Sequence, residues 1–498
     1  MKYKFNRKLS FISLLAIPFA LCITSCEREI SDDAVLATYP KTATIFTDAP
    51  IGPTDAFFES FDPASGANPS GFGTDNDVAY VGNTSIRIDV PAQNDPDGGY
   101  IGGIFRDRGA GRNLTGYDAL TFWAKGSTTA TIGTVGFGVD FDQNKHQVSV
   151  DNIQLSTDWR KYVIPIPDPS KLTQERGMFI FSAGTQSTNG VGFTFWIDEL
   201  RFEKLGNTNM LYPYIMNGNN ATANGFIGAN IVINQLGALF NLANGQNIAV
   251  KASPNYFSFS SSNTNVTGPF GRNSAGEAIT QVIAQTGSAV VTAQLGNVAA
   301  QGSLTINAVG AFPHAPIPTR NPSTVISLFS DAYNNAPVRH YNGFFTGSNT
   351  QGGAGNNPND VDIQAPFPNG NLDNIIHYTQ LDFVSFGMYE TVPRVNITGM
   401  THLHVDINVR ETVFAGNFIR VELHSSQPSG PTTSQGSFVI NTATLNNPNS
   451  NGWISLDIPI SSFAGFNDLN NLGQIFFVSG NPGGISSIWV DNVYFYAQ

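Results

Sequence analysis

Two stretches of the chain, separated by the whole middle of the sequence, contain the same series of strand-like segments. Each stretch has an apolar segment after a glycine turn, then a tryptophan segment ending in Ile-Pro, then a closing Trp-x-Asp segment. Apolar and polar residues alternate with period two in every segment, which is typical of strands with one buried face. Self-similarity over such a distance predicts two copies of one β-domain. The segments lie at 116–123, 157–166 and 195–202 in the first copy, and at 399–406, 451–460 and 488–495 in the second.

The region between the copies, 207–308, has fewer aromatic residues and short strands of small residues, such as 289–293. Gly and Asn turns separate these strands, a pattern typical of an immunoglobulin-like sandwich. A Pro-rich linker follows at 309–322, and such stretches are stiff and extended. We therefore predict an all-β protein with two β-sandwiches, at 51–206 and 323–498, separated by an immunoglobulin-like β-sandwich.

Composition agrees with an exported β-protein. Charged residues make up 12% of the chain, about half of the ~25% that is usual for soluble globular domains. The net charge of −12 argues against a nucleic-acid partner, because phosphate binding requires clustered lysine and arginine. The two cysteines, Cys22 and Cys26, both lie near the N-terminus, so we expect no disulfide in the body of the protein.

The N-terminus is typical of an export signal. Basic residues precede an apolar run at 11–21 that is too short to span a membrane. Cys26 then resembles the lipobox cysteine of bacterial lipoproteins, which implies a signal peptide at 1–25 and an acylated tether at 26–50. The acidic cluster at 27–33 resembles the surface-export signal of Bacteroidota lipoproteins, which implies an outer-membrane location facing the cell exterior. An ordinary secretory signal and a plain solvated tether are the alternatives.

Both copies resemble the galactose-binding-like jelly rolls of carbohydrate-binding modules, on segments such as 122–126 and 196–202 in the first copy and 326–333 and 400–406 in the second. The C-terminal copy also resembles domains appended to laminarinase-type glycoside hydrolases, and the middle region looks like a bacterial Ig-like spacer. The whole architecture resembles the surface glycan-binding lipoproteins of polysaccharide-utilisation systems. This resemblance implies a polysaccharide ligand, with a β-glucan such as laminarin favoured. It also implies two further partners, a glycan importer complex in the outer membrane and the lipid bilayer, reached through Cys26.

Flat aromatic rings bind the apolar side of pyranose rings, so the tryptophans are the first candidates for a glycan site. Trp123 has no counterpart in the second copy, where Asp406 stands in its place. The apolar residues beside Trp123 share one strand face, so its ring points to the other face. We predict Trp123 as a glycan platform; a tryptophan covered by a loop is the alternative. The other four occupy matching places in the repeat, which is what a shared core would produce: Trp159, Trp196, Trp453 and Trp489.

In the C-terminal copy, alternation leaves two rows of polar side chains that face away from the core. One row contains His404 and Asp406, and the other contains Arg420 and Glu422. We expect the two strands to be neighbours, so that both rows lie on one face and surround sugar hydroxyls. Ordinary solvated strand faces have the same pattern.

A Gly- and Asn-rich segment at 340–345 gathers four rings, which are costly to expose without a purpose. The related domains also carry aromatic residues in this loop. We therefore predict this segment as the binding rim, with rings from His340, Tyr341, Phe344 and Phe345.

The resemblance also implies structural Ca²⁺. In calcium-bearing jelly rolls, an acidic residue near the first strand meets the aspartate of the last strand. Glu59 with Asp198, and Asp331 with Asp491, occupy those positions, and carboxylate oxygens suit calcium. The alternative is that Asp198 and Asp491 only fix a turn.

Catalytic signatures are missing from the sequence. Glycoside hydrolases need paired carboxylates on the substrate groove, and no Glu-x-Asp-x-x-Glu run of the laminarinase type occurs. A nucleophile elbow, a P-loop and an HExxH motif are missing too. We therefore expect a protein without enzymatic activity or catalytic cofactor that captures polysaccharide at the cell surface. The alternatives are an adhesive surface protein that binds other proteins, and an unrecognised carbohydrate-active enzyme.

Overall fold

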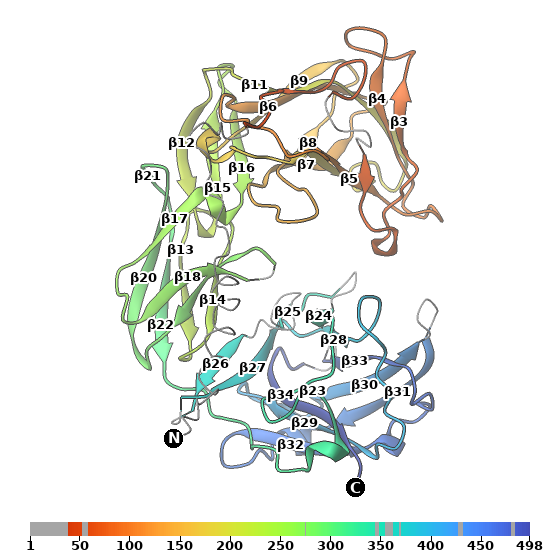
Figure 1. Ribbon diagram of the computed structural model, residues 1–498, viewed down its shortest axis with the longest axis vertical. Coiled ribbons are helices and arrows are strands. Elements are labelled where there is room, and N and C mark those ends of the chain that lie inside the picture. Colours follow the sequence, from red (N-terminus) through yellow and green to blue (C-terminus); the bar gives the residue numbers. More distant parts are fainter. Residues whose placement is uncertain are drawn as a thin grey trace, which may run out of the picture.

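The computed structural model describes residues 38–51, 58–273, 275–343, 348–353, 362–367, 370–426, 432–479 and 484–498. Three β-sandwich units follow one another and form an open arch, with the N-terminal sandwich at one end and the C-terminal sandwich at the other (Figure 1). The predicted all-β fold class is confirmed. Within the described ranges, no helix is long and apolar enough to cross a membrane.

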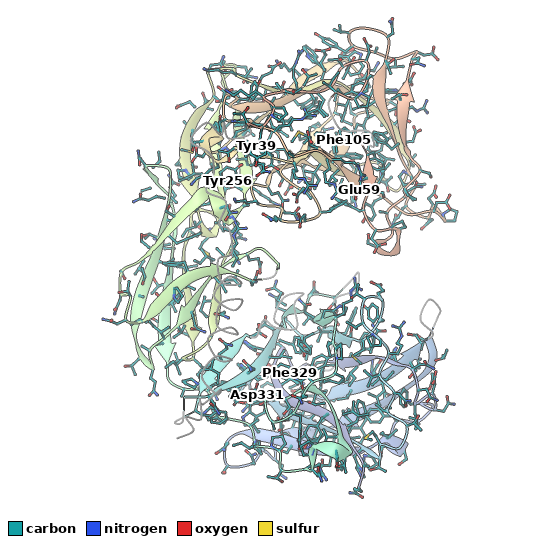
Figure 2. The ribbon with its side chains drawn as sticks, viewed as in Figure 1. Tyr39, Glu59, Phe105, Tyr256, Phe329 and Asp331 are labelled. Atoms are coloured by element: carbon teal, nitrogen blue, oxygen red, sulfur yellow. The ribbon has the colours of Figure 1, made fainter. Side chains whose placement is uncertain are left out.

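The N-terminal sandwich consists of two antiparallel sheets. The first has the strand order β3-β4-β11-β6-β9, with β1 against β11. Its strands are β1 (Thr44–Phe46), β3 (Phe72–Asp75), β4 (Ser85–Val90), β6 (Ala119–Gly126), β9 (Arg160–Pro165) and β11 (Phe193–Glu203). The second contains β2 (Glu59–Ser60), β5 (Ile101–Arg106), β7 (Thr131–Phe137), β8 (Val148–Gln154) and β10 (Gly177–Ala183). Alternating apolar residues such as Phe105 and Phe122 fill the space between the sheets; Figure 2 labels Phe105.

The middle unit, which we call the spacer, extends the second sheet of the N-terminal sandwich. The strand order runs β12-β15-β16-β8-β7-β10-β5-β2, so eight strands form one sheet. The connecting pairs are Lys251 with Ser149 and Ala252 with Val148. Hydrogen bonding therefore continues across the predicted boundary at 206. The three added strands are β12 (Asn209–Tyr214), β15 (Gly237–Asn241) and β16 (Asn247–Ala252).

The rest of the spacer has two small sheets, ordered β13-β22-β20-β17 with β21 against β20, and β14-β19-β18. Their strands are β13 (Asn220–Gly225), β14 (Asn230–Ile233), β17 (Phe257–Ser261), β18 (Thr267–Arg272), β19 (Ala278–Val282), β20 (Thr286–Leu295), β21 (Val298–Ala299) and β22 (Ser303–Val309). Tyr256, labelled in Figure 2, ties the spacer to the N-terminal sandwich, because its hydroxyl donates to the carbonyl of His146 at 3.0 Å.

The C-terminal sandwich again has two sheets. One is ordered β25-β27-β34-β29-β32, with β23 against β34 and β26 against β27, and the other β24-β28-β33-β30-β31. The first comprises β23 (Val325–Phe329), β25 (Gln351–Gly352), β26 (Ile363–Pro366), β27 (Leu372–Thr379), β29 (His402–Asn408), β32 (Trp453–Pro459) and β34 (Ser487–Tyr496). The second comprises β24 (His340–Gly343), β28 (Phe383–Gly387), β30 (Ile419–Ser426), β31 (Thr432–Ile440) and β33 (Leu472–Val478). The helical turns within the described residues are η1 (Pro63–Ser65), η2 (Pro169–Lys171), η3 (Met216–Gly218), η4 (Pro254–Tyr256), η5 (Pro322–Thr324), α2 (Thr442–Leu445) and η6 (Ile460–Ser462).

The two outer sandwiches share one detail of backbone geometry in their closing strands, β11 and β34. Each Trp-x-Asp segment is followed by a residue with positive φ, Glu199 at 50° and Asn492 at 51°. In each copy the preceding aspartate, Asp198 or Asp491, accepts the backbone N–H of that residue, at 2.7 and 2.6 Å. The repeated motif thus encodes a bulge that is held by its own aspartate.

Three of the four matching tryptophans, Trp196, Trp453 and Trp489, do not lie between the sheets, in contrast to the expected shared core. On β11 the neighbours of Trp196, Phe195 and Ile197, face the interior, so the Trp196 ring lies on the outer face of the sheet. Trp453 and Trp489 are buried, but under the linker: Phe312 packs on both rings, and the Trp453 indole donates to the carbonyl of Pro313 at 2.8 Å. These three tryptophans are structural, but their rings pack on the outer face of each sandwich.

Candidate functional site

A groove of about 970 Å³ lies on the outer face of the eight-stranded sheet. Its floor contains Gly133 on β7, Ser182 on β10 and Gly184 just after β10. A Cβ atom at Gly133 would lie 3.2 Å from the carbonyl oxygen of Ser182, so a larger side chain there would crowd the floor. Because these residues are small, few side-chain atoms stand above the backbone at the centre of this sheet face. A chain-like ligand can therefore approach the backbone closely.

Polar and aromatic groups line the two sides of the groove. On one side, the hydroxyl groups of Tyr100 and Ser65 are hydrogen-bonded at 2.8 Å. On the other, Asp151 forms an ion pair with Lys251 and accepts a hydrogen bond from Thr134 Oγ1 at 3.2 Å. Lys251 belongs to β16, so the spacer supplies one wall of the groove. An aromatic ring opposite a fork of donors and acceptors is what sugar recognition requires.

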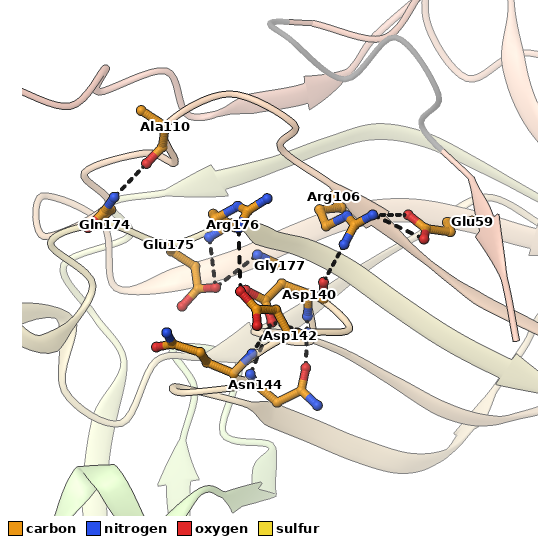
Figure 3. A network of polar contacts seen from close by, with 11 residues as sticks. Glu59, Arg106, Ala110, Asp140, Asp142, Asn144, Gln174, Glu175, Arg176 and Gly177 are labelled. Carbon is orange, nitrogen blue, oxygen red and sulfur yellow. Dashed lines mark hydrogen bonds and ion pairs between the residues drawn. The ribbon is translucent and has the colours of Figure 1, made fainter. Parts of the chain in front are cut away.

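A charged network lies at the far end of β5 on the same sandwich (Figure 3). Arg106 bridges Glu59, at 2.8 Å, and the carbonyl of Asp140, also at 2.8 Å. Near it, Glu175 accepts the backbone N–H groups of Arg176 and Gly177. Burial raises the pKa of Glu175 to about 7. This network fixes the loop after β7. It lies at the opposite end of the strands from the polar residues of the groove, so its charged side chains do not line the groove.

A family model described as carbohydrate binding domain 30 matches residues 42–204. The matched segment contains the N-terminal sandwich and most of the groove. This match supports a carbohydrate-binding role for that sandwich. No curated protein matches the chain.

Solved structures that are similar to parts of this chain include carbohydrate-binding modules and a β-1,2-glucanase from Parabacteroides distasonis. A family 30 module of a cellulosomal cellulase of Clostridium thermocellum is 19% identical, covers 33% of this chain and 98% of its own, and has a TM-score of 0.23. A family 11 module of the same organism, in complex with a β-1,3-1,4-mixed-linked tetrasaccharide, is 15% identical, with coverages of 37% and 98% and a TM-score of 0.24. A tandem of two family 22 modules from Paenibacillus barcinonensis is 10% identical, with coverages of 93% and 99% and a TM-score of 0.20.

Trp123, the predicted platform, lies on the outer face of the other sheet of the N-terminal sandwich, away from the groove. The ring of Tyr80 stacks on it, with centroids 3.9 Å apart and an interplanar angle of 15°. Tyr80 also contacts Trp159 at 5.9 Å. The structure thus matches the alternative in which a loop covers Trp123, and a glycan would have to displace Tyr80 to stack on that side of the ring.

The expectation that the two polar rows of the C-terminal copy share a face is wrong. Strand β29, with His404 and Asp406, and strand β30, with Arg420 and Glu422, belong to different sheets, so the rows lie on opposite sides of the sandwich. The sequence shows which residues face outward but not which sheet a strand joins.

The His404 and Asp406 row is covered by other parts of the chain. Asp406 is fully buried and accepts a hydrogen bond from Asn492 Nδ2 at 2.9 Å. His404 stacks on Tyr494 and contacts Asp457 at 2.8 Å. These contacts with Asn492, Tyr494 and Asp457 remove this row as an open glycan-binding surface.

The Arg420 and Glu422 row does lie on an open sheet face. Glu422 accepts hydrogen bonds from Arg420 at 2.5 Å and from His424 at 2.9 Å. The bond from His424 lowers the pKa of Glu422, so the carboxylate is ionised near neutral pH. The ring of Phe476 on β33 lies 4.7 Å from His424 and adds an aromatic surface.

The predicted rim at 340–345 is in part a strand, β24. Tyr341 points into the core, and its hydroxyl donates to the carbonyl of Leu328 at 2.9 Å. His340 is buried beside Tyr389, and burial lowers its pKa to about 4. Phe344 and Phe345 lie outside the described residues. Tyr341 is therefore a core residue and is not available to a ligand, because strand alternation continues through this segment.

The first predicted calcium pair does not come together. Glu59 lies on the eight-stranded sheet and pairs with Arg106 and Arg108, whereas Asp198 lies on the other sheet and accepts backbone N–H groups of Tyr80 and Val81. Each carboxylate has its own partners on its own sheet, so the two do not form one pair here, and calcium binding by Glu59 or Asp198 stays a prediction.

In the C-terminal copy, Asp331 accepts hydrogen bonds from Asn374, and Asp491 holds its bulge. Burial and the nearby carboxylate of Asp373 raise the pKa of Asp491. Over the described part of the chain, no group of three His, Cys, Asp or Glu side chains has the geometry to hold a metal. Calcium binding by Asp331 and Asp491 stays a prediction.

The groove residues Tyr100, Asp151 and Lys251 were missed by the sequence reasoning. The available signal was the run of Gly, Ser and Thr at outward positions of 131–136 and 182–184, where bulkier polar residues are usual on a solvated strand. Lys251 could not be found in this way, because it comes from a strand outside the sandwich that it serves.

Proposed function

We propose that the protein binds polysaccharide without cleaving it, with the groove of the N-terminal sandwich as its principal site. The observation that carries the proposal is the low Gly133, Ser182 and Gly184 floor between Tyr100 and the Asp151–Lys251 pair. The match of the surrounding sandwich to a carbohydrate-binding family supports it. Because the groove is open along the sheet, the interior of a glycan chain is the ligand that fits.

The open face of the C-terminal sandwich is a second contact in this proposal. In Figure 1 the sheet with β5, β7 and β8 and the sheet with β28, β30 and β33 lie on the sides of the two sandwiches that are turned toward each other. Arg420, Glu422 and Phe476 supply hydrogen-bonding groups and a ring on the latter. Two weak contacts on one polymer strengthen each other, because the second becomes intramolecular once the first has formed.

The cellular setting is also part of the proposal. Acylated Cys26 anchors the protein in the outer membrane, facing the cell exterior, and the bound glycan is passed to a neighbouring importer complex. The lipobox-like end of the export signal and the acidic residues after it support this placement. A β-glucan such as laminarin is the favoured ligand.

Affinity gel electrophoresis of residues 27–498 through a panel of polysaccharides, with parallel assays for reducing-sugar release, tests the function. We expect at least one polymer to retard the protein and no sugar to be released. Tyr100→Ala and Asp151→Ala are expected to abolish most of the retardation, whereas Trp123→Ala, on the opposite sheet, is the matched control that keeps it.

Retardation lost in Trp123→Ala but kept in Tyr100→Ala would move the site to the other sheet. Release of reducing sugar would refute the non-catalytic function. No retardation by any polymer would favour an adhesive protein that binds other proteins.

A further inference from the structure

A second cavity, of about 660 Å³, lies at the junction between the spacer and the C-terminal sandwich. Its volume is within the ~300–1,000 Å³ range of ligand pockets. Residues of the spacer around β13, β14 and β19 form one wall, and β24, β25, β27 and β34 form the other. Backbone hydrogen bonds fix the walls to each other: Asn230 N–H donates to Asp362 O at 3.0 Å, and Gln364 N–H to Gly228 O at 3.1 Å. The cavity is therefore preformed.

The polar lining of this junction cavity consists mainly of side-chain amides. Its two carboxylates have partners: Asp362 accepts the backbone N–H of His377 at 2.7 Å, and Glu277 accepts Asn273 Nδ2 at 2.8 Å. Among the described lining residues there is no lysine or arginine. Amides offer both donors and acceptors, so this lining suits a neutral ligand with many hydroxyl groups. The amides come from Asn224, Asn230, Asn234, Asn273, Asn342 and Gln351.

An aromatic pair forms part of the same wall. The rings of His377 and Trp489 are parallel, with centroids 4.2 Å apart and an interplanar angle of 4°. Burial lowers the pKa of His377 to about 4, so the imidazole is neutral near pH 7. The pair therefore adds a flat, uncharged surface to the amide lining.

Two buried polar atoms of the lining residues lack a hydrogen-bond partner among the residues that the structure describes. They are the indole N–H of Trp489, a donor, and Oδ1 of Asn342, an acceptor. The two residues are only 8% and 6% exposed. Buried polar groups are nearly always paired. Both atoms are closed to solvent in this structure, so a ligand hydroxyl group would pair with either one, accepting from the indole N–H or donating to Oδ1, after a small shift of the cavity wall.

We propose that the junction cavity binds a short neutral saccharide, a chain end or a free oligosaccharide. The ligand class rests on the proposed function, but the site is separate from the groove. The open groove accommodates the interior of a polymer, whereas a cavity enclosed between two units accommodates an end. The protein would then recognise the interior of a glycan chain in the groove and the end of the chain in the cavity.

Isothermal titration of residues 27–498 with cellobiose, laminaribiose, mannobiose and xylobiose tests this proposal. The titrations are made in a background with both Tyr100→Ala and Asp151→Ala, so that the groove contributes little. We expect at least one disaccharide to bind. Trp489→Phe keeps a ring against His377 and removes only the indole N–H, so it is expected to weaken binding by about three- to tenfold. Gln351→Ala, an exposed lining residue, is a second variant with little risk to folding.

Melting temperatures of the variants show whether each one is folded. Polysaccharide retardation in otherwise wild-type protein is expected to survive Trp489→Phe, which separates this site from the groove. The proposal is overturned when no disaccharide binds, or when folded Trp489→Phe and Gln351→Ala both bind like the parent. Failure of the groove function would instead show as lost polysaccharide retardation with the disaccharide titrations intact.

Discussion

The N-terminal and C-terminal sandwiches have the same closing strand but differ in what covers it. In the N-terminal sandwich the outer face of β11 and β6 is covered by one loop, whose Tyr80 stacks on Trp123. In the C-terminal sandwich the equivalent face of β34 and β29 is covered by the linker, with Phe312 against Trp453 and Trp489. The repeated motif therefore packs under a single loop in one copy and under the linker between two units in the other.

The largest difference is expected from removal of the matching tryptophans Trp453 and Trp159. Trp453 is fully buried and donates to Pro313, so Trp453→Ala should lower the free energy of unfolding by about 3–5 kcal/mol. Trp159→Ala removes a half-buried ring and should cost about 1–2 kcal/mol. Urea unfolding followed by circular dichroism measures both. Equal losses would show that the junction does not depend on the Trp453 contact.

The two sandwiches should also differ in how pH affects their stability. Burial raises the pKa of Glu175 from 4.5 to about 7 and the pKa of Asp373 from 3.8 to about 6. The folded state keeps these protons longer than the unfolded state, so each group lowers stability as pH rises through its window. His146, whose pKa falls to about 4 on burial, acts in the opposite direction.

Differences between variant and wild type isolate each carboxyl group. The advantage of Glu175→Gln over wild type should grow by up to about 3 kcal/mol between pH 4.5 and 7. The advantage of Asp373→Asn should grow between pH 3.8 and 6. Urea unfolding at pH 4, 5, 6, 7 and 8 gives both curves. If the advantages of both variants grew over the same pH range, the burial environments of Glu175 and Asp373 would not differ as described.

A third comparison concerns glycan affinity. Asp151→Ala in the groove should weaken polysaccharide binding by about tenfold, because it removes a charged partner of Lys251 and an acceptor in the wall. Glu422→Gln on the open face should weaken it by about two- to threefold, because that face is the secondary contact. Retardation coefficients from affinity gels measure both. The reverse order would make the C-terminal sandwich the principal site.

The smallest effect is expected for the loop cover of the N-terminal sandwich. Tyr80 is 37% exposed and contributes one stacked pair, so Tyr80→Ala should cost about 1 kcal/mol. Its loss also uncovers Trp123, so a polysaccharide that now quenches tryptophan emission would show a cryptic platform. Unchanged emission in the presence of polymer is the expected result.

Strand periodicity predicted the fold well, because it reports which side chain faces the interior at each position. The outward direction of Trp123, Arg420 and Glu422 followed from it. The same reasoning failed for Asp406, which faces outward and is nevertheless fully buried, because Asn492 lies against it and also donates to Pro316 of the linker. Burial between units depends on contacts among segments far apart in the chain, and no local pattern encodes them.

The candidate groove could not be predicted from local sequence patterns, for a similar reason. Its floor is defined by small residues on adjacent strands, and adjacency on a sheet depends on topology. Its charged wall pairs Asp151 with Lys251, which the chain places in another unit. Sequence reasoning searched for prominent rings and charges, whereas the groove is a place where side chains are small.

The continuous eight-stranded sheet has a consequence for biosynthesis. Strand β8 gains its outer partner only when β16 (Asn247–Ala252) has been made. Until then β8 is an open sheet edge, and open edges invite pairing with other chains. The first sandwich to emerge during synthesis is therefore not the first to be complete. A fragment that ends at the apparent boundary near 206 would leave the Val148 and Ser149 end of β8 unpaired and should aggregate more readily, whereas one that ends after 309 pairs this end.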